Sequence, residues 1–166
     1  MTRLLRFWKD QSGVALVELA FGIPLMFLVF AVTVEGGRMF YAYQAVIEGV
    51  RDAGRYAGRA VPRDLCISGG AVTDFVDTTA LTTLVSRSAG ANPVFPMMIA
   101  VTGVDATHRC VGVAGDYRVS PAPVVEVTAT LQIRFPFQAF ARAFFADNAM
   151  GTITTTVSDE SRVFGS

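Results

Sequence analysis

The sequence feature that most constrains this chain is a long apolar run from Val14 to Val34. Of its 21 residues 17 are apolar, and the exceptions are Glu18, Gly22, Pro24 and Thr33. As an α-helix such a run extends for about 32 Å, which matches the roughly 30 Å hydrocarbon core of a bilayer. The run therefore predicts a transmembrane helix over residues 14–34. Because proline has no backbone N–H, we expect a kink or a loosened turn at Pro24.

The charges before this helix predict its orientation. The first thirteen residues contain three basic side chains and one acidic side chain, namely Arg3, Arg6, Lys9 and Asp10. After the run, Glu35 and Arg38 balance each other. Basic residues are retained on the cytoplasmic side of single helices. We therefore expect residues 1–13 to be a cytoplasmic basic leader. The chain would span the inner membrane once, and its C-terminal domain would lie outside the cytoplasm.

A secretory signal peptide also begins with basic residues and continues with an apolar stretch. The apolar region of a signal peptide typically has about 7–15 residues, and the present run of 21 residues is longer. The residues after it, Val32-Thr33-Val34-Glu35, form a poor small-x-small cleavage site. These observations favour a retained helix, and a plain uncleaved anchor is the competing interpretation.

Glu18 is the unusual residue of the apolar run. An acidic side chain in a membrane helix costs on the order of a few kcal/mol at the bilayer centre and less near the interface, so it indicates a function and a partner. The surrounding sequence is Ser12-Gly13-Val14-Ala15-Leu16-Val17-Glu18. A glycine ends the basic leader, the apolar run starts at once, and the glutamate is its fifth residue.

This arrangement resembles the class III leader of type IV pilins, which a prepilin peptidase cuts after glycine. The resemblance implies that Gly13 precedes the cut and that Val14 becomes the new N-terminus. It also implies that Glu18 pairs with the N-terminal amine of another pilin subunit during assembly. A carboxylate and an ammonium group can neutralise each other where neither is well solvated.

The likeness extends from about Arg3 to Ala60 and is closest to the TadE-like minor pilins. Its later parts are Glu35-Gly36-Gly37-Arg38-Met39-Phe40-Tyr41 and Arg51-Asp52-Ala53-Gly54-Arg55-Tyr56-Ala57. Tad-type major pilins usually have tyrosine after the glutamate, whereas this chain has Leu19. The resemblance implies a minor pilin or pseudopilin of a Tad-type system. Its partners would be the membrane, a prepilin peptidase, other Tad pilins and the inner-membrane assembly platform. The alternative is an uncleaved, membrane-anchored envelope protein whose exported domain binds a ligand or partner.

Residues 35–60 continue the helical pattern beyond the membrane. Apolar and small residues recur at spacings of three and four, which is one face of a helix: Met39, Tyr43, Val46, Val50, Ala53 and Ala57. Gly54 and Gly58 would permit a close approach of another backbone. That backbone belongs either to a neighbouring helix in a fibre or to the chain's own sheet. Pro62 predicts that the helix ends near Ala60.

Residues 61–166 are predicted to form a small exported α+β domain with an antiparallel sheet. We expect a loop over 65–70, a helix over 73–88 and strands over 97–104, 124–135 and 152–158. The strand over 124–135 has the clearest alternation of apolar and polar residues. Phenylalanines between Phe137 and Phe145 suggest a short amphipathic helix that lies on the membrane, on a neighbour or over the core.

The two cysteines, Cys66 and Cys110, lie in this domain. In an oxidising compartment a disulfide between them is favoured, and two buried free thiols are the alternative.

The residues suggest no catalytic or metal site. His108 is the only histidine, which excludes a site with several histidines, and there is no Gly-x-Ser-x-Gly elbow or P-loop. The formal net charge is zero and no basic stripe is interleaved with aromatic residues, so nucleic acid is not an expected partner. We therefore expect a protein that is not an enzyme and needs no metal or cofactor.

Overall fold

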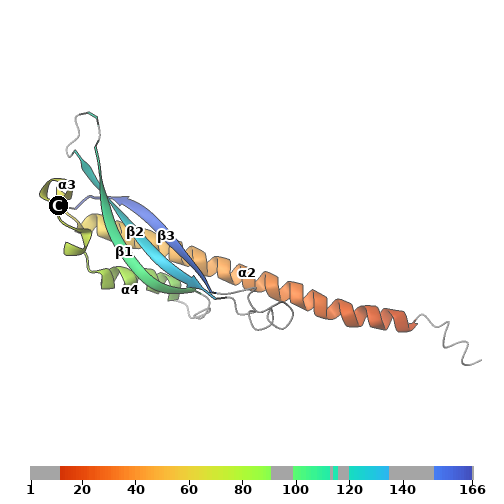
Figure 1. Cartoon of the computed structure of the whole chain (residues 1–166). Coiled ribbons are helices and arrows are strands. Elements are labelled where there is room, and N and C mark those ends of the chain that lie inside the picture. Colours follow the sequence, from red (N-terminus) through yellow and green to blue (C-terminus); the bar gives the residue numbers. More distant parts are fainter. Residues whose placement is uncertain (1–11, 91–98, 113, 116–119, 135–151, 166) are drawn as a thin grey trace, which may run out of the picture. The chain divides into compact units, whose positions relative to one another are not determined.

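The computed structural model describes residues 12–90, 99–112, 114–115, 120–134 and 152–165. The chain divides into two compact units, Met1–Arg38 and Met39–Ser166. Helix α2, Ser12–Ala60, provides the described part of the first unit and the first element of the second (Figure 1). Residues 1–11 of the leader and the predicted helix over Phe137–Phe145 lie outside the described residues.

Helix α2 ends at Ala60, as predicted from Pro62. The residue before a proline disfavours helical backbone angles, so the helix ends before Val61. Pro24 lies inside the helix, which continues on both sides of it. The kink at Pro24 stays a prediction.

The second unit contains a three-stranded antiparallel sheet, which confirms the α+β fold. Its strands are β1 (Ile99–Val111), β2 (Ala122–Ile133) and β3 (Ile153–Arg162), in the order β1-β2-β3. Val127, near the middle of β2, is opposite Ala106 on one side and Asp159 on the other. Along β2, buried and partly exposed residues alternate, as its sequence predicts.

The strands differ in extent from those predicted. Strand β1 runs to Val111 instead of ending near Val104, and β3 runs to Arg162 instead of Ser158. Both extensions contain polar residues, so hydrophobicity alone does not reveal them. They form because β2 offers backbone partners along its whole length, up to the pairs Val111↔Ala122 and Val124↔Arg162.

The predicted loop and helix between residues 65 and 90 are partly wrong. Cys66 lies in a short helix, α3 (Leu65–Ser68), rather than in a loop. The predicted helix over 73–88 is divided into a 3₁₀ turn, η1 (Val72–Asp74), and helix α4 (Thr78–Gly90).

Two carboxylates explain this division. The Asp74 carboxylate accepts a hydrogen bond from the Ala71 N–H at 2.8 Å, which closes the first turn. The Asp77 carboxylate accepts one from the Thr79 N–H at 2.8 Å, which begins the next helix. A side chain that binds free backbone N–H groups starts a helix, so the second carboxylate restarts the helix after Asp77.

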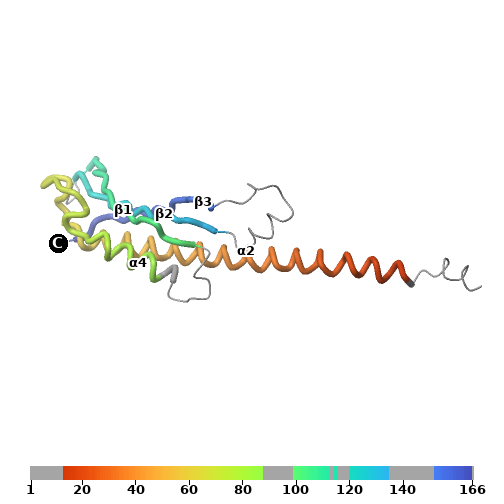
Figure 2. The backbone as a smooth tube through the Cα atoms, turned by 60° about the horizontal axis from the view of Figure 1, so that its bottom comes forward, coloured from red at the N-terminus to blue at the C-terminus, as the bar shows by residue number. Residues whose placement is uncertain are grey.

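The core of the second unit lies between the sheet and the helices. Figure 2 shows the strands along one side of α2. Helix α4 lies on the same face of the sheet as α2. The helical face predicted from spacing is confirmed, since Val46, Val50, Ala53 and Ala57 are fully buried. The sheet contributes Val104, Val125, Val127, Ala129 and Leu131. The segment between α2 and β1 contributes Leu65, Val72, Val76, Leu81 and Val85.

Gly54 and Gly58 pack against β3, which decides between the two predicted roles for these residues. A Cβ atom on Gly54 would lie 3.3 Å from a carboxylate oxygen of Asp159. A Cβ atom on Gly58 would lie 2.9 Å from both the Arg162 carbonyl oxygen and Ser161 Oγ. The close approach that these glycines permit is therefore used by the chain's own sheet.

The residues after β3 return to the end of α2. The Phe164 N–H donates a hydrogen bond to the Gly58 carbonyl oxygen at 2.7 Å. Arg63 Nε donates one to the Gly165 carbonyl oxygen at 2.6 Å. A Cβ atom on Gly165 would overlap the Val61 carbonyl oxygen, so only glycine fits there. These contacts fix the strand that packs on Gly54 and Gly58.

Candidate functional site

The candidate site begins with the apolar part of α2. By length and composition, the described residues contain one helix able to cross a membrane, over Gly13–Ala60 and near the N-terminus. None of its most apolar 18-residue window is buried by the protein. A bare apolar helix of this length needs an apolar environment, and a bilayer provides one.

Glu18 lies in the second turn of this helix and its side chain is exposed. None of the residues that the structure describes forms an ion pair or a hydrogen bond with it. Gly13 and Val14 are in the first turn, and a Cβ atom on Gly13 would meet nothing within 4 Å. The predicted cut and the carboxylate therefore lie on one helical segment, one turn apart, and both are accessible.

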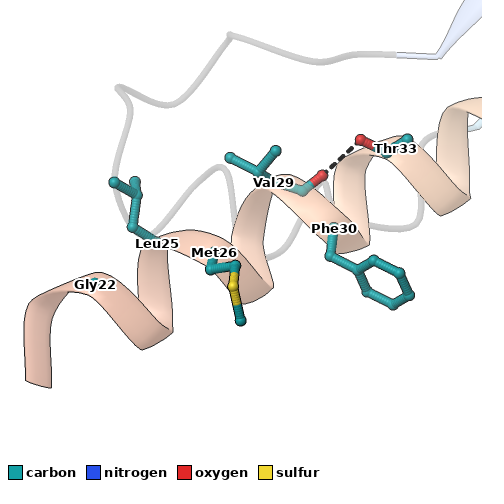
Figure 3. Close-up of a pocket in the computed structure, with 6 residues that line it drawn as sticks. All are labelled: Gly22, Leu25, Met26, Val29, Phe30 and Thr33. Carbon is teal, nitrogen blue, oxygen red and sulfur yellow. Dashed lines mark hydrogen bonds between the residues drawn. The ribbon is translucent and has the colours of Figure 1, made fainter. Parts of the chain in front are cut away.

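A hollow lies beside the middle of this segment. Figure 3 shows its lining residues, which recur at spacings of three and four along one side of the helix: Gly22, Leu25, Met26, Val29, Phe30 and Thr33. The only hydroxyl among them, on Thr33, donates a hydrogen bond to the Val29 carbonyl oxygen at 2.8 Å. Because this bond satisfies the hydroxyl inside the helix, the whole side can face an apolar medium. Sequence reasoning did not single out this side.

In the second unit the structure joins Cys66 and Cys110 in a disulfide. The sulfur atoms are 2.01 Å apart and the bond closes a sequence separation of 44. The disulfide ties α3 to the C-terminal end of β1. The alternative of two buried free thiols does not hold, since Cys110 is exposed and both sulfurs are bonded.

The disulfide also bears on the search for metal ligands. His108 lies opposite the buried Val125, two residues before Cys110. Both cysteine sulfurs are engaged in the disulfide and cannot serve as thiolate ligands beside His108. Across the described ranges, no three His, Cys, Asp or Glu residues gather in a way that could hold a metal ion.

A close ion pair lies on the outward face of the sheet. Arg109 of β1 donates a hydrogen bond to the Glu160 carboxylate of β3. This hydrogen bond first, then the charges of Glu160 and Glu126, raise the pKa of Arg109 above its ordinary value. Because arginine already titrates far above neutrality, Arg109 is cationic at every physiological pH. Sequence reasoning missed this pair, because it joins strands that are not neighbours in the sheet.

Three arginines of α2, spaced four residues apart, form an arginine row that faces outward. Arg51, Arg55 and Arg59 are exposed, opposite the buried face of the helix. Asp52 and Arg55, three residues apart on the helix, form an ion pair at 3.6 Å. Glu48 and Arg51 form no ion pair in the structure. Both groups of the formed pair are well exposed to solvent, where such pairs contribute little to stability.

Comparison with known proteins adds one match. Residues 13–55 match the family model of TadE-like proteins. The matched range begins at Gly13, contains Glu18 and the exposed hollow, and ends within the arginine row. It confirms the resemblance predicted from the sequence. No curated protein and no solved structure gives a significant match to the chain.

Proposed function

We propose that this chain is a minor pilin or pseudopilin that a prepilin peptidase cuts after Gly13. Its residues 13–55 match the TadE-like family, which indicates a Tad pilus-related protein. The observation that carries the proposal is the coincidence of three features at one place. The family match, the exposed apolar helix and the Gly13 to Glu18 spacing all begin within two residues of each other. Each feature alone is common, and their coincidence is what the pilin leader requires.

The proposed topology follows from charge and hydropathy. The basic leader holds the N-terminus in the cytoplasm, the apolar part of α2 spans the inner membrane, and the second unit lies outside the cytoplasm. The disulfide supports this placement, because such bonds persist in oxidising compartments. The peptidase hydrolyses the peptide bond between Gly13 and Val14 and leaves a cationic amine on Val14.

Glu18 gives this cleavage a purpose in assembly. Before cleavage the Glu18 carboxylate lies in an apolar segment, and none of the described residues provides it with a cationic partner. A charged group there is costly unless it is paired. The amine on Val14 of a second processed subunit supplies that cation, and pairing draws one subunit to the next. In this proposal the protein is a substrate of the peptidase and a structural component, not an enzyme.

The proposal is tested by the intact mass of the protein extracted from the membranes of a host that has the peptidase. We expect a mass that lacks residues 1–13. The variant Gly13→Val is expected to keep its full length, because it replaces the glycine after which the proposed cut is made with a branched residue. Full-length wild-type protein in this host would sink the processing step and favour an uncleaved anchor.

Gly22→Val is the matched control. A Cβ atom at either glycine meets nothing within 4 Å, so neither substitution creates a clash in the helix. Gly22→Val should be processed like the wild type. If both variants stayed uncut, impaired insertion and not the cleavage site would explain the result.

A further inference from the structure

One end of the second unit presents an apolar surface, which we call the basal edge and define as Phe40, Tyr41, Ile99, Ile133 and Ile153. Three of its side chains are strongly exposed, with 65% of Phe40, 66% of Tyr41 and 50% of Ile153 accessible. The other two, Ile99 and Ile133, are partly exposed, and Ile99 also packs against the core. A group of large apolar residues on one end of a small domain indicates a surface that something covers.

The isoleucines form one row across the sheet. Ile133 pairs with Ile99 on one side and with Ile153 on the other. The row is the last set of paired residues at this end of the sheet. Its side chains belong to the face that is buried further along β2, at Leu131, Ala129 and Val127. The apolar face of the sheet therefore continues past the core and emerges at the basal edge.

The aromatic residues of α2 lie at the same level as this row. Asp159 is beside Gly54, and β3 reaches Gly58 at Ser161, so the start of β3 lies toward the start of the helix. From Asp159 back to Ile153 the strand covers roughly 20 Å, and the helix covers that distance in about 13 residues. Counting back from Gly54 gives the turn that contains Phe40 and Tyr41.

We infer that the basal edge rests in the interfacial layer of the membrane, with its apolar side chains at the boundary between headgroups and acyl chains. Phe40 follows the apolar run by only six residues, and that run ends at Val34. The basal edge is thus continuous in sequence with a membrane-spanning segment. Tyrosine is enriched at this layer because one end of its side chain is apolar and the other is hydrated.

The charges around the basal edge fit lipid headgroups. In residues 39–43, 99–101, 131–134 and 152–155, the single charged residue is Arg134, and it is exposed. Guanidinium groups bind phosphate well, and the absence of carboxylates in these ranges avoids repulsion from anionic lipids. The inference rests on the membrane-spanning role of α2 and does not require cleavage at Gly13.

The test places a single tryptophan at the basal edge of the protein, which is produced in a host that has the peptidase and is then placed in lipid nanodiscs. Trp8 is the only tryptophan in the chain, so Trp8→Phe removes the background signal. Tyr41→Trp and Ile153→Trp are the two reporters, one on the helix and one on the sheet. Tyr56→Trp is the matched control, since Tyr56 is also exposed, at 46%, on the same helix but four turns further along.

We expect both reporters to emit at shorter wavelength than the control and to be quenched by brominated lipids. The control should be quenched by acrylamide in the aqueous phase instead. Reporters that behave like the control would overturn the inference. So would reporters shielded from both quenchers, since another part of this chain or a second copy would then cover the edge.

The two reporters also guard against a misfolded variant, because each is introduced separately. The mass of the same samples reports on processing at Gly13. A correctly cut protein with solvent-exposed reporters would contradict this inference and leave the processing step intact. An uncut protein with lipid-quenched reporters would contradict the processing step and leave this inference intact.

Discussion

A Cβ atom on Gly58 would lie 2.9 Å from the carbonyl oxygen of Arg162. Backbone atoms of α2 and β3 are therefore in contact where the Phe164 N–H also binds the Gly58 carbonyl oxygen. This contact sets the position of β3 on the helix, and through β3 the position of the sheet edge that we place at the membrane.

Gly58→Ala is expected to lower the free energy of unfolding of the second unit. Overpacking against a backbone typically costs about 1–3 kcal/mol, and the better helix propensity of alanine offsets up to about 1 kcal/mol of this. Thermal or urea unfolding of the full chain in nanodiscs measures the change. Gly54→Ala is the control, because its nearest neighbour at 3.3 Å is an Asp159 side-chain oxygen that can move. Equal stability of the two variants would contradict the backbone contact.

Reducing the disulfide is expected to destabilise the second unit substantially. The bond closes a loop of 44 residues. On the chain-entropy model a loop of this length contributes about 4 kcal/mol, an upper figure where strain intervenes. Denaturant unfolding with and without dithiothreitol measures this contribution. The double variant Cys66→Ser/Cys110→Ser should have the same free energy of unfolding as the reduced wild type, with or without reductant. If the stability of the double variant changed with reductant, the disulfide would not explain the effect.

Asp77→Ala is expected to destabilise helix α4 by about 1 kcal/mol, which is typical for loss of an N-cap. The carboxylate now accepts the Thr79 N–H at 2.8 Å, and alanine leaves that donor without its partner. Asp77→Asn keeps an acceptor oxygen and should remain close to the wild type. Unfolding free energies of the two variants measure the difference. If Asn were as harmful as Ala, charge and not capping would be the cause.

Glu18→Ala is expected to leave membrane insertion intact and to abolish pilus assembly. Removing a carboxylate from an apolar helix favours insertion, whereas assembly loses the proposed partner of the amine on Val14. Membrane fractionation and electron microscopy of pili measure the two outcomes. Thr33→Ala is a suitable control in the same helix, because the Thr33 hydroxyl already binds the Val29 carbonyl oxygen. Normal piliation of Glu18→Ala cells would remove Glu18 from the mechanism.

Several features of this protein can be predicted from local sequence patterns alone. Periodicity predicts the buried helical face at Val46 and Val50 and the alternation along β2. The chemistry of Pro62 predicts the end of α2, and the apolar run is read directly from the sequence. These patterns are legible because burial repeats every 3.6 or 2 residues along one element. The place of Glu18 at the start of the membrane run is likewise fixed by the order of residues alone.

Other features became clear only from the way in which distant parts of the chain pack together. This packing placed Gly54 and Gly58 against the chain's own β3 and extended β1 and β3 beyond their predicted ends through pairing with β2. A local hydrogen bond to the Asp77 carboxylate restarted a helix after that residue. The strand pairing also brought Ile99, Ile133 and Ile153 into one row from three distant segments. Each of these outcomes depends on a partner far away in sequence or on competition between hydrogen bonds. Neither the spacing nor the hydrophobicity of a single segment contains that information.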